Sequence, residues 1–160
     1  MEIKYSCVQK KYAIIATCQL NQWAMSFKHN RDNIIKSILM CIEKGVSYRL
    51  GPELEICGYS CEDHFFELDT VNHSWQMLAD ILSDHRNLTN NILCDIGMPV
   101  FYKGSLYNCR VFCLNKQILL IRPKLFLAYG NNYRENRWFK QWNIENGYGV
   151  EDFDLPDCIT

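Results

Sequence analysis

The order of the apolar patterns along the chain restricts its fold more than any other feature. In the first half, short runs typical of strands alternate with segments of helical spacing. Strands are predicted at Tyr12–Cys18, which reads as a buried strand, and at Ser47–Leu50. The second strand is expected to end at Gly51-Pro52, because proline cannot donate to a sheet ladder.

A helix is predicted after each of these strands, because each is followed by apolar residues at helical spacing. The first helix is expected to be capped by Asn30 and to end at Gly45, since glycine is common just beyond a helix C-terminus. Its apolar residues are Ile34, Ile35, Ile38, Leu39 and Ile42. Those of the second helix are Val71, Trp75, Leu78 and Leu82.

The second half of the chain predicts strands that follow one another directly. They are expected at Ile92–Val100, Leu106–Leu114 and Ile118–Ile121, with turns at Lys103-Gly104 and Asn115-Lys116. Strands that alternate with helices favour parallel pairing, and successive strands favour antiparallel pairing. The fold class is therefore predicted to be α/β with a mixed sheet.

Composition excludes several classes of function. A length of 160 residues gives room for one domain. A content of 48% hydrophobic and 22% charged residues is ordinary for a globular protein. The 17 Lys and Arg balance 18 Asp and Glu, so no nucleic-acid partner is expected. No apolar run approaches the ~18 residues of a membrane span, and no signal-peptide pattern is present. No membrane partner is expected, and the predicted location is cytoplasmic.

The nine cysteines are predicted to be free and mostly buried thiols, because nothing in the sequence indicates secretion. Two pairs, Cys57/Cys61 and Cys109/Cys113, have a four-residue spacing that does not suit a zinc site. One loop holds residues that read as polar surface rather than as metal ligands: Asp63, His64 and Glu67. No metal site is predicted.

Two predicted strands end in a proline that is followed at once by a charged residue. These are Pro52-Glu53 and Pro123-Lys124. Ligands of α/β sheets bind beyond the carboxyl ends of the strands, where a carboxylate and an ammonium could act as general base and oxyanion stabiliser. The alternative is an exposed ion pair of little energetic value, which the pattern alone favours.

Several blocks of sequence between residues 16 and 142 carry a resemblance to a known family. They are Ala16–Trp23, Tyr48–Tyr59, Cys94–Val100, Tyr107–Val111, Leu120–Lys124, Asn132–Glu135 and Arg137–Phe139. Together they resemble the amino-terminal glutaminase domain of eukaryotic-type glutamine-dependent NAD synthetases, a domain of the nitrilase (carbon–nitrogen hydrolase) type. The resemblance implies a four-layer α-β-β-α sandwich, of which residues 1–160 would form the amino-terminal portion.

The resemblance also implies roles for individual residues. Glu53 would be the general base, Lys124 the oxyanion stabiliser and Glu135 a supporting glutamate. Tyr59 and Tyr133 would lie on the substrate side. The implied substrate is glutamine, and the implied partners are a synthetase domain or full-length subunits in a homo-oligomer. Ammonia from glutamine would serve the ATP-dependent amidation of nicotinic acid adenine dinucleotide.

The catalytic cysteine of that family has no counterpart in this sequence. It would lie in a Cys-Glu segment well beyond the lysine, but only Cys158 follows Lys124, and it lies ahead of that position. The ATP-binding Ser-Gly-Gly-x-Asp-Ser segment is also missing, so ATP and magnesium are expected in a separate synthetase domain and no cofactor in this chain. The chain alone is expected to be inactive. It would be a fragment, a truncated splice form or a decayed copy.

Two other interpretations stay open. One is a different nitrilase-type amidohydrolase, which the long block from Arg49 to Tyr59 disfavours, because only Pro-Glu is general to that superfamily. The other is a non-catalytic module that binds or modulates a full-length subunit. The missing cysteine supports this second interpretation, whereas Glu53 and Lys124 give it no support.

Overall fold

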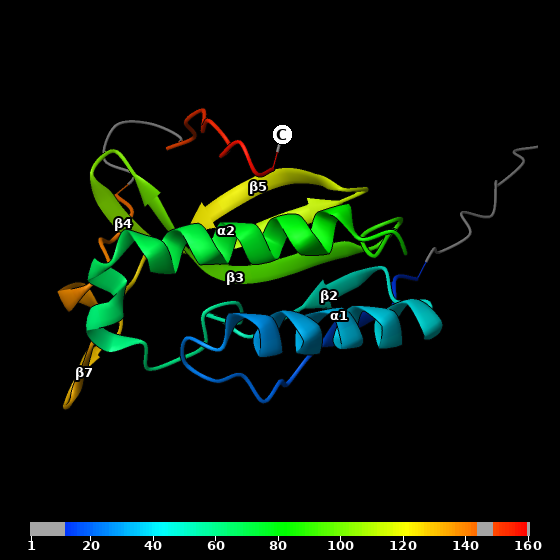
Figure 1. Cartoon of the computed structure of the whole chain (residues 1–160), viewed down its shortest axis with the longest axis horizontal. Helices are drawn as coiled ribbons and strands as arrows, with labels where there is room; N and C mark the ends of the chain where they lie inside the picture. Colours follow the sequence, from blue (N-terminus) through cyan, green and yellow to red (C-terminus); the bar gives the residue numbers. More distant parts are fainter. Residues whose placement is uncertain (1–11, 144–148, 160) are drawn as a thin grey trace, which may run out of the picture.

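The computed structural model describes residues 12–143 and 149–159, in which strands and helices follow the predicted order. Along the chain, two α-helices alternate with three parallel strands, and an antiparallel meander follows (Figure 1). The elements of this part are β1 (Ile15–Thr17), α1 (Phe27–Glu43), β2 (Tyr48–Leu50), the 3₁₀ helix η1 (Glu62–Phe66), α2 (Leu68–Ser83), β3 (Leu93–Tyr102), β4 (Ser105–Leu114) and β5 (Gln117–Pro123). A short hairpin of β6 (Tyr129–Gly130) and β7 (Tyr133–Arg134) then precedes the 3₁₀ helix η2 (Glu135–Arg137).

The strands β1 to β5 form a single sheet in sequence order. β1 pairs parallel to β2 and β2 parallel to β3, whereas β3, β4 and β5 pair antiparallel. The prediction of a mixed sheet is therefore confirmed. Both predicted turns use left-handed backbone conformations, with φ of 43° and 74° at Lys103 and Gly104 and of 51° and 66° at Asn115 and Lys116.

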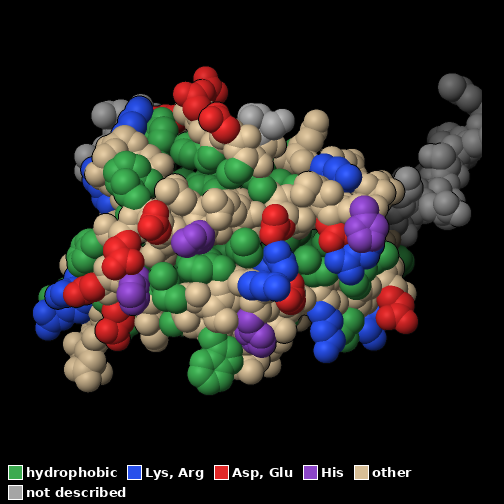
Figure 2. Space-filling model, viewed as in Figure 1, with side chains coloured by type: hydrophobic (Ala, Val, Ile, Leu, Met, Phe, Trp, Pro, Cys, Tyr) green, Lys and Arg blue, Asp and Glu red, His purple; other side chains and the backbone are tan. Residues whose placement is uncertain are grey.

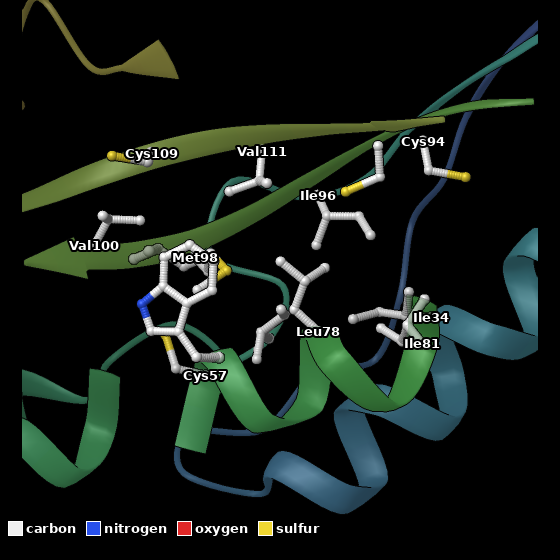
Figure 3. Packing of buried hydrophobic residues seen from close by; sticks show 14 of the residues in the cluster. Ile34, Cys57, Leu78, Ile81, Cys94, Ile96, Met98, Val100, Cys109 and Val111 are labelled. Atoms are coloured by element: carbon white, nitrogen blue, oxygen red, sulfur yellow. The ribbon is translucent and has the colours of Figure 1, made fainter. Parts of the chain in front are cut away.

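Both α-helices pack on one face of this sheet (Figures 1 and 3). Figure 3 shows Ile34 of α1 and Ile81 of α2 close together, with Leu78 of α2 directed towards Ile96 and Met98 of β3. These five side chains are fully buried. Burying each large aliphatic side chain contributes about 1.5–3 kcal/mol, so this interface supplies much of the stability. A helix layer on a mixed sheet is one half of the predicted α-β-β-α sandwich.

The strand predicted to be buried at Tyr12–Cys18 is shorter and more exposed than expected. β1 spans only Ile15–Thr17, and 70% of Ile15 is exposed. The prediction of burial was wrong because β1 is the outer strand of the sheet and has only β2 beside it. An apolar run predicts a strand, but its burial depends on what packs against it.

Two details of the predicted first helix were also wrong. α1 begins at Phe27 after Ser26, so Asn30 lies inside the helix and is not its cap. Its side chain instead bonds the loop before the helix: Oδ1 accepts from the Trp23 amide at 2.9 Å, and Nδ2 donates to the Trp23 carbonyl at 2.7 Å. The buried face includes Ile34, Ile38 and Cys41, whereas Leu39 and Ile42 are exposed.

The eight cysteines of the described residues are all free thiols, and six are buried. No group of three or more His, Cys, Asp or Glu side chains in this part of the chain could hold a metal ion. Among the described residues, no helix is long and apolar enough to cross a membrane. Positive and negative side chains are mixed on the face seen in Figure 2 and form no basic stripe there.

We expect the chain to self-associate in solution, because its sheet has an open edge and several apolar side chains lie in water. The exposed fractions are 70% for Ile15, 56% for Leu119, 48% for Leu120 and 80% for Phe126. Exposed strand edges and apolar patches favour association. Size-exclusion chromatography with light scattering should show oligomers or poor recovery. A sharp monomeric peak, together with cooperative thermal unfolding of the protein in that peak, would contradict this expectation.

Candidate active site

β2 ends at Leu50, two residues before Pro52, and β5 ends at Pro123. The two strands point the same way and finish at one edge of the sheet. β2 is parallel to β3, and β5 is antiparallel to β4, which is itself antiparallel to β3. β2 and β5 therefore run in the same direction. Glu53 follows β2 and Lys124 follows β5, so the fold brings their side chains together.

Lys124 lies between two carboxylates. Its Nζ is 2.8 Å from Oε1 of Glu53 and 2.8 Å from Oε2 of Glu135. Glu135 begins η2 and is fully buried, whereas 39% of the Glu53 side chain is exposed. The backbone amide of Ala128 also donates to Oε2 of Glu135. The pair is therefore more than the exposed ion pair that the pattern alone favoured.

The charges of this group shift its pKa values. Burial lowers the pKa of Lys124, but hydrogen bonds to Glu135 and Glu53 outweigh it and raise this pKa. Burial raises the pKa of Glu135, but hydrogen bonds from Lys124, Ala128 and Asn108 outweigh it and lower that pKa. Ionised Glu135 therefore stabilises the fold above the unfolded carboxyl pKa of about 4.3, and this contribution is lost as pH falls through the folded value.

The sequence reasoning missed Asn108, which contacts both carboxylates. It lies on β4, and its Nδ2 donates to Oε1 of Glu53 at 2.6 Å and to Oε1 of Glu135 at 3.0 Å. The period-two alternation of β4 was the available signal, since it places Asn108 and Arg110 on one face and Cys109 on the other.

Arg110, also missed, holds the backbone ahead of Glu53. Its guanidinium donates to the carbonyls of Gly51 at 3.0 Å and of Pro52, and to the Asp95 carboxylate at 2.6 Å. Gly97 on β3 allows this loop to lie against the sheet: a Cβ there would stand 1.7 Å from the carbonyl oxygen of Glu53. The position of Glu53 therefore depends on both residues.

A buried ion pair supports the same loop from the core side. Arg49 of β2 donates to both carboxylate oxygens of Glu55, at 3.0 and 2.8 Å, and neither side chain is exposed. Arg49 also donates to Oγ of Ser37 on α1 at 2.8 Å. Burial lowers the pKa of Arg49, but the Glu55 carboxylate outweighs it and raises that pKa. The pair ties the loop that carries Glu53 to β2 and α1.

The two predicted substrate-side tyrosines lie near this group. The hydroxyl of Tyr59 accepts the backbone N–H of Glu53 at 2.8 Å, and 45% of Tyr59 is exposed. Tyr133 lies on β7, where burial, followed by the charges of Glu135 and Glu53, raises its pKa. Contact of either ring with a substrate stays a prediction.

A shallow hollow of ≈ 310 Å³ opens beside Lys124. It is lined by Glu53, Asn108, Arg110, Arg122, Pro123, Lys124 and Leu125. No cysteine is among these residues. On this wall, the carboxylate can remove a proton from a nucleophile and the ammonium can stabilise an oxyanion. These two roles suit hydrolysis of an amide.

An α/β half-sandwich with this carboxylate–lysine–carboxylate group agrees with the comparisons to known proteins. Residues 14–153 match the carbon–nitrogen hydrolase family, and the chain belongs to that family. It is 56% identical over 150 residues to a glutamine-dependent NAD(+) synthetase of Dictyostelium discoideum, covering 94% of this chain and 21% of that protein. The human enzyme of the same name is 51% identical over 145 residues, covering 91% and 20%.

Solved structures show the same fold. A glutamine-dependent NAD(+) synthetase from Cytophaga hutchinsonii superposes with a TM-score of 0.77 at 27% identity, over 84% of this chain and 23% of that one. An amidase of the nitrilase superfamily from Nesterenkonia superposes with a TM-score of 0.65 at 22% identity, over 79% and 47%, and shares the fold alone. The chain thus spans about a fifth of the length of the curated relatives it matches.

Proposed function

We propose that this chain is the amino-terminal portion of the glutaminase domain of a glutamine-dependent NAD synthetase. The observation that carries the proposal is Lys124 held between Glu53 and the buried Glu135 at 2.8 Å from each. Relatives that are 51–56% identical and share this synthetase name favour glutamine over the substrate of another nitrilase-type amidohydrolase. The assignment of residues 1–160 to this portion of the domain is part of the proposal, as are the roles of Glu53, Lys124 and Glu135.

The proposed reaction is hydrolysis of the glutamine side-chain amide. Glu53 takes the proton of a cysteine thiol, and the thiolate sulfur bonds to the amide carbon. Lys124 stabilises the resulting oxyanion with its ammonium. The carbon–nitrogen bond then breaks and ammonia leaves, so that a thioester remains. Water hydrolyses this thioester, which releases glutamate and restores the thiol.

The thiol of this reaction is proposed to come from outside these 160 residues. Cys109 is adjacent to Asn108 but points to the opposite face of β4, into the core, and burial raises its pKa far above the ordinary value. Burial also raises the pKa of Cys94 to about 12. Such protonated, enclosed thiols are poor nucleophiles.

The remaining proposals concern the whole protein. Ammonia would pass to a synthetase domain that binds ATP and magnesium and amidates nicotinic acid adenine dinucleotide, and the subunits would form a homo-oligomer. A solved synthetase from Acinetobacter baumannii is in complex with adenosine diphosphate, which supports a nucleotide site in such proteins. Free thiols support a cytoplasmic location.

We expect the 160-residue chain alone to release no ammonia from glutamine, because it lacks the nucleophile. Sequencing of the transcript beyond the codon for Thr160 should then show that the reading frame continues into a Cys-Glu segment. In that longer polypeptide, Glu53→Gln should lower kcat by about 10²–10⁴-fold, whereas Glu151→Gln, an exposed glutamate paired with Lys103, should not. Ammonia release by the short chain that disappears in Glu53→Gln would contradict the proposal.

A further inference from the structure

Asn108 connects the segment that follows β2 with the segment that follows β5. Its side chain is almost fully buried, with 2% of the residue exposed. Its backbone carbonyl accepts the N–H of Lys124 at 2.8 Å, which anchors the chain where β5 ends. Its side chain contacts Glu53 and Glu135. One residue of β4 therefore touches every member of the charged group.

The four side chains form a closed ring of hydrogen bonds. The two hydrogens of Asn108 Nδ2 go to Oε1 of Glu53 at 2.6 Å and to Oε1 of Glu135 at 3.0 Å. Nζ of Lys124 donates to the same oxygen of Glu53 and to the other oxygen of Glu135. Donors and acceptors alternate around the ring, which fixes how far apart the two carboxylates lie.

The charges in this ring do not cancel. Two carboxylates share one ammonium, and a nearby like charge favours protonation of a carboxylate, as burial does. The Asn108 amide donates to both carboxylates and does not itself titrate, and its hydrogen bond to Glu135 stabilises the ionised form of that buried residue. The other charged or titratable groups around the ring are Arg110, Arg122, Tyr59 and Tyr133.

The two hydrogen bonds to the Glu53 carboxylate both end on Oε1. No hydrogen bond from the described residues reaches its Oε2, and Glu53 lines the hollow. We propose that Asn108 is a positioning residue of this site: it holds Oε1 of Glu53 and Oε1 of Glu135, and so leaves Oε2 of Glu53 to accept the proton of the nucleophile. This inference rests on the proposed glutaminase function.

The ring can be tested in the 160-residue chain by ¹³C NMR with labelled glutamate, whatever its oligomeric state. Asn108→Ala removes a donor from the ionised Glu135 and should raise the pKa of that carboxyl by about one unit. Asn30→Ala is the matched control, because Asn30 is equally buried but bonds only backbone groups. It should lower the melting temperature and leave the pKa of Glu135 unchanged.

An unchanged pKa of Glu135 in Asn108→Ala would overturn the inference, as would an equal shift in Asn30→Ala. If Asn108→Ala does not fold, Asn108→Ser keeps one donor and should give a smaller shift of the same sign. No shift in the serine variant would then overturn the inference.

Kinetics of the longer polypeptide separate this inference from the proposed function. There, Asn108→Ala should lower kcat for glutamine about tenfold or more and leave KM nearly unchanged, whereas Asn30→Ala should keep kcat. An unchanged kcat in Asn108→Ala would overturn the positioning role. If the unmodified polypeptide does not hydrolyse glutamine, the proposed function fails, while a shifted pKa of Glu135 would still support the ring.

Discussion

Arg49→Met is expected to destabilise the chain by about 3–5 kcal/mol, because it leaves the carboxylate of Glu55 buried without its partner. Both side chains of this pair are completely enclosed, and the Gly97 amide is 3.3 Å from the same carboxylate. The free energy of unfolding in urea measures the loss. Methionine keeps an unbranched side chain in the space, so the missing charge dominates the effect.

The double variant Arg49→Met/Glu55→Leu serves as the control for this prediction. It removes both charges and should recover most of the lost stability, since replacing a buried pair with apolar residues is often close to neutral. A double variant as unstable as Arg49→Met alone would show that packing or the contact with Ser37, and not the unpaired carboxylate, causes the loss.

Gly97→Ala is expected to cost about 3 kcal/mol and to displace Glu53. The added methyl would stand 1.7 Å from the Glu53 carbonyl oxygen and 2.7 Å from Nη1 of Arg110. Because the nearer neighbour is backbone, the loop must move as a whole. Urea unfolding measures the cost, and the pKa of Glu135 from ¹³C NMR reports whether Lys124 and its partners stay in place.

Gly130→Ala is the matched control for this substitution. Gly130 is also a strand residue, its φ is not in the left-handed region, and nothing lies within 4 Å of a Cβ built there. Its effect should stay within about 0.5 kcal/mol. An equal loss in the two variants would show that the contact with Glu53 is not the cause.

The sequence predicted the order of strands and helices because periodicity and turn residues are local properties. The Lys103-Gly104 turn and the face that includes Leu78 are examples. The exposure of β1 was not predictable in the same way, since an apolar run has the same pattern at the edge of a sheet as in its centre. Ile15 is such a residue.

The candidate site was only partly predictable. Because a strand is expected to end at a proline, the sequence predicted that Glu53 and Lys124 follow strand ends. The topology then brings the two side chains together. Glu135 came from the resemblance alone, because no local pattern marks it. Asn108 depends on the register of β4 against β3, where it lies opposite Pro99. A slip of one residue would turn it towards the helices and Cys109 towards Glu53, so the sequence alone could not assign it.

The enclosure of Glu135 affects how long its partners would persist through evolution. A carboxylate with no exposed surface needs the ammonium of Lys124 whether or not any reaction takes place. Selection for a folded chain would therefore preserve this lysine in a descendant that had lost its nucleophile. Retention of Lys124 and Glu135 in a distant copy is evidence of a stable fold. Activity must be judged from the partly exposed Glu53 and from the presence of a cysteine opposite it.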